Sequence, residues 1–197
     1  MSAASHWITD LHCASRPAAL LADADWAAAC LGGALPEAVE AALRAAGSAY
    51  ADDDLAERHL LQASALAPDH PAVLIAWYRF CFYKGRLMQA RELGLRCLTL
   101  AARGCGLPES WQTVSATAAR FDDFAAVAER FYLFSLKGCA YLSLRLGDLS
   151  LGQAMLAKLR ELDPADRLGG AVLALVLARR GADEDECDRH AHLEWAS

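Results

Sequence analysis

The 197-residue sequence has little basic charge and no long apolar run. Nineteen Lys and Arg residues against 25 Asp and Glu residues give a formal net charge of −6. A nucleic-acid-binding protein would present a basic face, so we expect no nucleic-acid partner. The longest apolar run, residues 169–178, is about half the length of a membrane-spanning helix, so we expect no membrane partner.

The short motifs of common enzymes are also missing. No HExxH, GxSxG, Walker or GxGxxG pattern occurs in the sequence. Its acidic clusters, Asp52–Asp54 and Asp122–Asp123, stand at predicted helix starts, where carboxylates complement the helix dipole. We therefore expect a protein that is not an enzyme and uses no cofactor.

Neither a secretory signal nor a paired-cysteine motif is visible. The first twelve residues lack the basic and apolar regions of a signal peptide. The seven cysteines form no CxxC pair, and an odd number of cysteines in a reducing compartment is typical of small buried hydrophobic residues. These features predict a cytoplasmic protein.

One cluster near the C-terminus has metal-ligand character. Cys187, His190 and His192 lie within six residues, and Cys13 is a further candidate ligand. A metal- or redox-responsive protein is therefore a minor alternative. A zinc site usually needs four ligands on a rigid frame, so a solvated tail without metal is the favoured interpretation.

High Ala and Leu content and helical periodicity predict an all-α protein of about seven to nine helices with no sheet. We expect an irregular segment at 1–16, one helical domain at 17–181 and an acidic tail at 182–197. Pro and Gly breaks give the helix limits. The predicted helices cover residues 17–31, 36–50, 53–67, 72–83, 87–102, 109–119, 122–146 and 165–180, with a further helix between the Gly147–Asp148 turn and Pro164.

Two of these helices have distinctive side chains. In the first, Leu20, Leu21, Trp26 and Leu31 are expected to pack onto the helices that follow. The 72–83 helix carries five aromatic residues within seven positions, and at 100° per residue they surround it. This helix is therefore expected to be contacted on several sides.

The second helix of each predicted pair carries a repeated pattern with a 34-residue period. Ala90 follows Ala56 by one such period, and buried-type residues follow each at +4 and +7. The same offsets recur from Gly152, which lies outside the 34-residue period. Pro164 follows Gly152 at +12, as Pro68 follows Ala56. The three copies are Ala56, Leu60, Ala63; Ala90, Gly94, Cys97; and Gly152, Leu156, Leu159.

A 34-residue period with small residues on the second helix resembles the tetratricopeptide (TPR) family. The resemblance covers residues 37 to about 102 and about 133 to 180, and the 103–131 segment interrupts it. It implies a degenerate TPR-like antiparallel helical array, an α-solenoid, and a function in protein binding as an adaptor or chaperone. TPR domains that clamp chaperone C-termini use asparagines in their groove, and this sequence contains no Asn.

The resemblance also implies a binding surface on the first helix of each pair. Aromatic and Arg residues there are typical of protein-binding hot spots, although core packing is an equally good explanation for Phe82 and Tyr83. The predicted partner-binding residues are Ile75, Arg79, Phe82 and Tyr83 in one pair and Lys137, Tyr141, Leu144 and Arg145 in the other. We expect the two groups to converge on one concave face.

Two kinds of TPR protein are similar to this one. Small bacterial accessory factors that associate with large metalloenzymes, including nitrogenase, are similar in size, cytosolic character and Ala content. The implied partner is then a metalloenzyme such as nitrogenase. The alternative is the class of type III secretion chaperones, whose turns resemble residues 67–71 and Gly147–Asp148.

Overall fold

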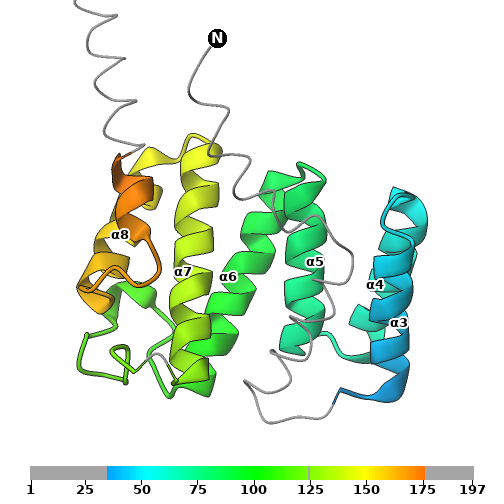
Figure 1. Cartoon of the computed structure of the whole chain (residues 1–197), viewed down its shortest axis with the longest axis horizontal. Helices are drawn as coiled ribbons and strands as arrows, with labels where there is room; N and C mark the ends of the chain where they lie inside the picture. Colours follow the sequence, from blue (N-terminus) through cyan, green and yellow to red (C-terminus); the bar gives the residue numbers. More distant parts are fainter. Residues whose placement is uncertain (1–34, 124, 176–197) are drawn as a thin grey trace, which may run out of the picture. The chain divides into compact units, whose positions relative to one another are not determined.

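A computed structural model describes residues 35–123 and 125–175 of the chain (Figure 1). No strand occurs in these ranges, which confirms the all-α prediction for them. The predicted helix at 17–31 and the segments 1–16 and 182–197 lie outside the described residues. The helices are α3 (Glu37–Ser48), α4 (Asp53–Leu66), α5 (Pro71–Tyr83), α6 (Leu87–Gly104), the 3-10 helix η2 (Trp111–Thr113), α7 (Val127–Arg145) and α8 (Leu149–Leu162).

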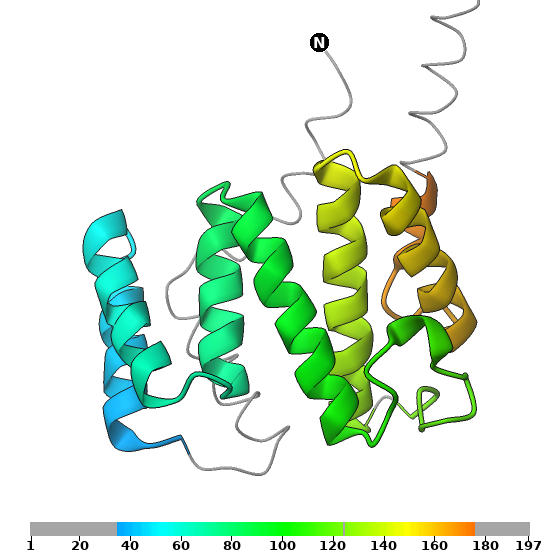
Figure 2. The same cartoon turned by 180° about the vertical axis from the view of Figure 1, so that it is seen from behind.

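The chain divides into two compact units, with the boundary inside α6 between Leu100 and Ala101. In the first unit, α4 packs against both α3 and α5. In the second, α7 packs along α8, and η2 contacts α8. Figures 1 and 2 show the α3–α4 and α7–α8 pairs side by side from opposite directions.

Aspartate side chains cap two of the helices, α4 and α8. The Asp52 carboxylate accepts a hydrogen bond from the Leu55 N–H at 3.0 Å and so caps α4. Asp148 caps α8 in the same way through the Leu151 N–H. Such caps satisfy N–H groups that have no partner inside the helix.

The turns after α5 and α7 have the same geometry. Gly85 and Gly147 adopt φ values of 73° and 84°, the left-handed conformation that favours glycine. After Gly85, the Arg86 N–H bonds the Cys81 carbonyl at 2.8 Å. After Gly147, the Asp148 N–H bonds the Ser143 carbonyl at 2.9 Å. Both are Schellman turns, which end a helix and reverse the chain within three residues.

All nine residues of the 34-residue pattern are buried. Ala56, Ala63 and Ala90 have no exposed surface; Gly94, at the +4 position of its copy, and Gly152, at the first position of its copy, are buried as well. The pattern therefore marks the inner face of α4, α6 and α8. Tyr83 is the one exposed residue of α5, and the other residues of this helix are buried or half-buried. Its contact with helices on several sides stays a prediction.

The predicted helix at 109–119 is wrong. Only Trp111–Thr113 is helical there, as a single 3-10 turn. The Thr113 hydroxyl donates to the Ser110 carbonyl at 2.9 Å, and the Thr117 N–H donates to the Ser115 hydroxyl at 3.3 Å. Ser and Thr side chains that bond nearby backbone groups compete with helix formation.

Helix α7 begins at Val127, five residues later than predicted. The Asp123 carboxylate accepts from the Ala125 N–H at 2.9 Å and closes a turn before the helix, so it does not cap α7.

The last helix also begins later than predicted, at residue 170 in place of 165. Buried Asp163 holds the intervening loop by accepting from the Arg167 and Leu168 N–H groups at 3.2 and 2.9 Å. Asp166 in this loop has a positive φ of 50°, which is incompatible with a right-handed helix.

A close helix contact in the second unit lies at Gly152. A Cβ atom there would stand 2.4 Å from Leu144 Cδ2 and 3.2 Å from the backbone oxygen of Ala140. Helices α7 and α8 can approach to this distance only because residue 152 has no side chain.

We expect Gly152→Ala to lower the melting temperature by about 2–4 °C. Overpacking typically costs about 1–3 kcal/mol, which exceeds the roughly 1 kcal/mol that Ala gains over Gly inside a helix. Thermal unfolding followed by circular dichroism measures the shift. Gln153→Ala, an exposed neighbour, is the matched control and should unfold near the native temperature. A Gly152→Ala protein more stable than the native chain would contradict the close contact.

Candidate functional site

Helix α5 carries an aromatic cluster at its C-terminal end. Tyr78 and Phe82 are stacked, with ring centroids 6.1 Å apart and an interplanar angle of 14°. Phe82 meets Tyr83 edge-on at 5.4 Å, and the Arg79 guanidinium lies 5.9 Å from the Tyr83 ring. The cluster is therefore ordered by contacts within its own helix, which lowers the entropy that a binding partner would have to remove.

The predicted residues of α5 differ in exposure. Tyr83 is 38% exposed, whereas Ile75, Arg79 and Phe82 are half-buried. Ile75, Arg79 and Phe82 follow the i, i+4, i+7 spacing and share one helix face. This face combines an apolar surface with a guanidinium, the composition of binding hot spots.

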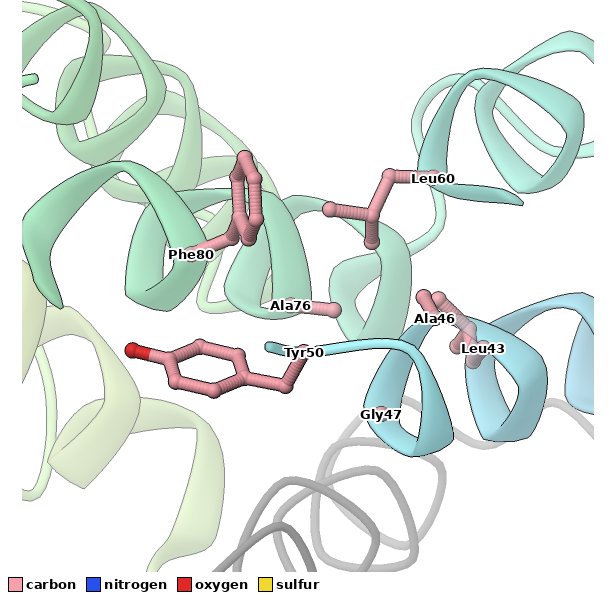
Figure 3. A pocket seen from close by; sticks show the side chains of 7 residues that line it. All are labelled: Leu43, Ala46, Gly47, Tyr50, Leu60, Ala76 and Phe80. Atoms are coloured by element: carbon pink, nitrogen blue, oxygen red, sulfur yellow. The ribbon is translucent and has the colours of Figure 1, made fainter. Parts of the chain in front are cut away.

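An apolar recess lies among α3, α4 and α5 in the first unit (Figure 3). Tyr50 and Phe80 form two of its walls, with ring centroids 6.5 Å apart and nearly perpendicular planes. The Leu60 side chain of α4 points toward Ala76 and Phe80 of α5. The lining residues are Leu43, Ala46, Gly47, Tyr50, Leu60, Ala76 and Phe80.

Two cations after α5 fasten it to the start of α4. The Lys84 ammonium bonds Asp53 at 2.6 Å, donates to the Tyr50 carbonyl at 2.9 Å and stands 4.3 Å from the Tyr50 ring centroid. Burial raises the pKa of the Tyr50 phenol, and nearby Lys84 opposes that rise.

Arg86, two residues further on, bonds Glu57 of α4 at 2.7 Å. The hydrogen bond from Arg86 to Glu57 is the main cause that raises the pKa of Arg86. Asp53 in the first turn of α4 and Glu57 one turn later are therefore the partners of Lys84 and Arg86.

The predicted residues of α7 separate into two kinds. Lys137 donates to the Leu168 carbonyl and so holds the 163–169 loop; burial lowers its pKa, while Asp166 and Asp163 oppose the shift. Leu144 packs against Gly152. Both residues have contacts inside the second unit that account for their position.

Tyr141 and Arg145 form a pair nearer the surface of α7. The Arg145 guanidinium donates to the Tyr141 hydroxyl at 2.7 Å and lies 5.7 Å from the ring centroid. Arg145 is exposed and Tyr141 is half-buried. The structure brings the α5 residues together on one helix and the α7 residues on another, and the convergence of the two groups stays a prediction.

Some surface residues were not predicted from the sequence. Tyr50 was missed because it follows the last turn of α3, outside any helical pattern. Leu61 and Leu66 on α4 and Phe134 on α7 are about half exposed. For Leu61 and Leu66, the signal available in the sequence was their position on faces of α4 away from the 34-residue pattern.

Three of the described cysteines, Cys81, Cys97 and Cys105, are poor nucleophiles. Burial raises the thiol pKa to about 11 for Cys81 and Cys105 and to about 12 for Cys97. Thiols with such pKa values stay protonated near neutral pH, and the thiolate is the reactive form.

Residues 35–123 and 125–175 contain no group of three or more His, Cys, Asp or Glu side chains placed to hold a metal. The candidate ligands Cys13, Cys187, His190 and His192 lie outside these ranges. Among the described helices, none has the length and apolarity to cross a membrane.

The described fold is an all-helical protein of consecutive packed helices with buried small residues in a repeated phase. No family model matches the chain, and no solved structure matches it. The chain is 42% identical over 134 residues to the "Uncharacterized 19.8 kDa protein in nifW 5'region" of Azotobacter chroococcum mcd 1. The match covers 65% of this chain and 72% of the relative, so the chain belongs to the same family as that protein.

His70 makes the stability of α5 sensitive to pH. Its Nδ1 accepts from the Ala72 N–H at 3.2 Å and caps the helix, which requires a neutral ring. Burial lowers the pKa of His70 below its ordinary value of 6.5. The unfolded chain therefore takes up the proton more readily, so the stabilisation present above pH 6.5 is lost as pH falls through the folded-state pKa.

We expect the melting temperature to fall between pH 7 and pH 5 more steeply in the native chain than in His70→Asn. Asn supplies an N-cap oxygen and does not titrate, which makes it the matched control. Thermal unfolding at several pH values measures the two slopes. Equal slopes in both proteins would show that the His70 cap does not govern the response.

Proposed function

We propose that this protein is a non-catalytic, cytoplasmic protein-binding factor that serves as an accessory to a nitrogen-fixation enzyme such as nitrogenase. Two features support the proposal: the repeated helix pairs and the gene position of the relative. The proposed binding residues are the aromatic and Arg side chains of α5 and the Tyr141–Arg145 pair of α7.

The helix pairs support a TPR-like array. The first residues of α3 and α5 are separated by one 34-residue period, and so are those of α4 and α6. The small residues of the 34-residue pattern are buried in α4, α6 and α8. In arrays of this kind, each pair packs on its neighbours and the accumulated surface binds other proteins.

The choice of partner in this proposal rests on the gene position of the relative. That protein is placed in the nifW 5′ region, and nifW is a nitrogen-fixation gene. The position favours a nitrogenase-related partner over the translocator proteins that type III secretion chaperones bind. An accessory role is also compatible with the protonated thiols of Cys81, Cys97 and Cys105.

We expect the purified protein to bind anaerobically purified nitrogenase, and Arg79→Ala or Tyr141→Ala to weaken that binding about 5–30-fold. Each substitution removes a planar side chain that ranks among the strongest contributors to interfaces. Biolayer interferometry measures the affinity, and thermal unfolding of the same samples measures stability. Arg160→Ala on the exposed side of α8 is the matched control, with affinity near that of the native chain.

Two outcomes would contradict parts of the proposal. Absence of binding to nitrogenase by the native chain would remove the partner. Early unfolding of Arg79→Ala and Tyr141→Ala with native affinity per folded molecule would assign both residues to the core and the interface to another surface.

A further inference from the structure

Helix α7 has two exposed side chains, and both lie on one face of the helix. Phe134 is 46% exposed and Arg145 is exposed, while every other residue of α7 is buried or half-buried. Residues eleven positions apart are separated by about three full turns, so these two side chains share a face. Gly138 and Tyr141 lie between them, at the i+4 and i+7 positions from Phe134. These four residues form the α7 stripe.

The α7 stripe is not the face of α7 that packs on α8. Ala140 and Leu144 approach Gly152 of α8, and each precedes a stripe residue by one position. One position turns an α-helix by about 100°, so α8 packs on a different side of α7.

The guanidinium of Arg145 contacts a neutral group. It donates to the Tyr141 hydroxyl at 2.7 Å and lies 5.7 Å from the centroid of the ring. Other arginines in the described part of the chain bond carboxylates: Arg44, Arg86, Arg96, Arg103 and Arg120. A guanidinium has five N–H donors, and one of those of Arg145 serves Tyr141. The exposed fork of Arg145 therefore suits a carboxylate from a partner.

The helix dipole explains only part of this arrangement. Arg145 stands in the last turn of α7, where the dipole favours a cation. The dipole explains neither the contact between Arg145 and Tyr141 nor the exposure of Phe134 three turns earlier.

The contact between Arg and Tyr recurs in α5 with the residue types exchanged. Counted back from the left-handed glycine that follows each helix, Arg79 corresponds to Tyr141 and Tyr83 corresponds to Arg145. The Arg79 guanidinium lies 5.9 Å from the Tyr83 ring centroid. Equivalent positions of the two helices thus hold a guanidinium against a Tyr ring, although neither position keeps its residue type. A guanidinium held in this way loses less conformational freedom when it binds a carboxylate.

From these contacts we infer that the α7 stripe binds an amphipathic helix of a partner protein, with a carboxylate at one end of its apolar face. Apolar side chains of that helix contact Phe134 and Tyr141, and its Asp or Glu pairs with Arg145. The inference rests on the protein-binding function proposed above and adds the chemistry of the partner at this surface.

The length and surroundings of the stripe favour a helix as the occupant. The stripe is about 16 Å long at 1.5 Å per residue, and a partner helix presents side chains with the same i, i+4, i+7 and i+11 spacing. A partner strand would need a sheet edge for its backbone, and residues 35–123 and 125–175 contain no strand.

Selection from a phage-displayed library of helical peptides, randomised along one face, tests the inference without nitrogenase. On the native chain we expect enrichment of an apolar face with Asp or Glu at one end. On Arg145→Glu the enriched end residue should change to Lys or Arg, because the charge of the stripe is reversed. Selection without an acidic end residue on the native chain, or with the same acidic residue on Arg145→Glu, would overturn the inference. Absence of nitrogenase binding would remove that enzyme as the partner and leave this outcome unchanged.

The affinity of a selected peptide, measured by fluorescence polarisation, tests the individual side chains. Phe134→Ala and Arg145→Ala should each weaken binding about 10-fold, and Arg145→Lys should weaken it less because the charge remains without the planar fork. Higher salt concentration should weaken binding by the native chain more than binding by Arg145→Ala. Val172→Ala and Arg160→Ala remove exposed side chains of the second unit outside the stripe and are the matched controls, with native affinity.

Two results of these measurements would contradict the inference. Native affinity in both Phe134→Ala and Arg145→Ala would show that the peptide binds elsewhere. A dimer of the chain that Phe134→Ala dissociates, detected by analytical ultracentrifugation, would assign the stripe to a second copy.

Discussion

The described helices depend on a close approach that only small residues permit. Ala56 and Ala90 are completely buried, and Gly152 leaves no room for a Cβ beside Leu144 and the Ala140 carbonyl. With two backbones this near, the large side chains must find space elsewhere. On α5 they occupy the remaining faces, and Tyr83 lies at the surface.

The charged residues near these packed helices mainly stabilise the fold. Asp52 caps α4, and Asp53 and Glu57 bind the two cations that follow α5. On α7, Lys137 holds the 163–169 loop through the Leu168 carbonyl. Binding a partner protein through these charged side chains would be unfavourable, because each would leave a buried or half-buried group without its hydrogen bond or ion pair. The surface that we propose for recognition consists of aromatic residues and guanidiniums that are in contact with one another.

Charged residues that stabilise the fold and aromatic and Arg residues at the surface agree with the accessory role that we propose. A protein that binds a large enzyme needs a stable scaffold and a preorganised surface, and the stacked Tyr78 and Phe82 rings are ordered before any partner arrives. The relative is named for the nifW 5′ region, and the interface that we propose consists of side chains of α5 and α7.

Much of the helical layout was determined by the sequence alone, because caps, Schellman glycines and the 34-residue pattern act locally. Asp52, Gly85 and Gly147 set helix limits close to those predicted. Hydroxyl-rich residues 110–117 also act locally, but their competition with helix was not recognised from the sequence. Only the tertiary structure decided that Lys137 serves the Leu168 carbonyl, that Leu144 packs on Gly152, and that Tyr50 joins Phe80 at the apolar recess. Each of these contacts joins residues on different elements, and helical phase specifies a face without specifying what lies against it.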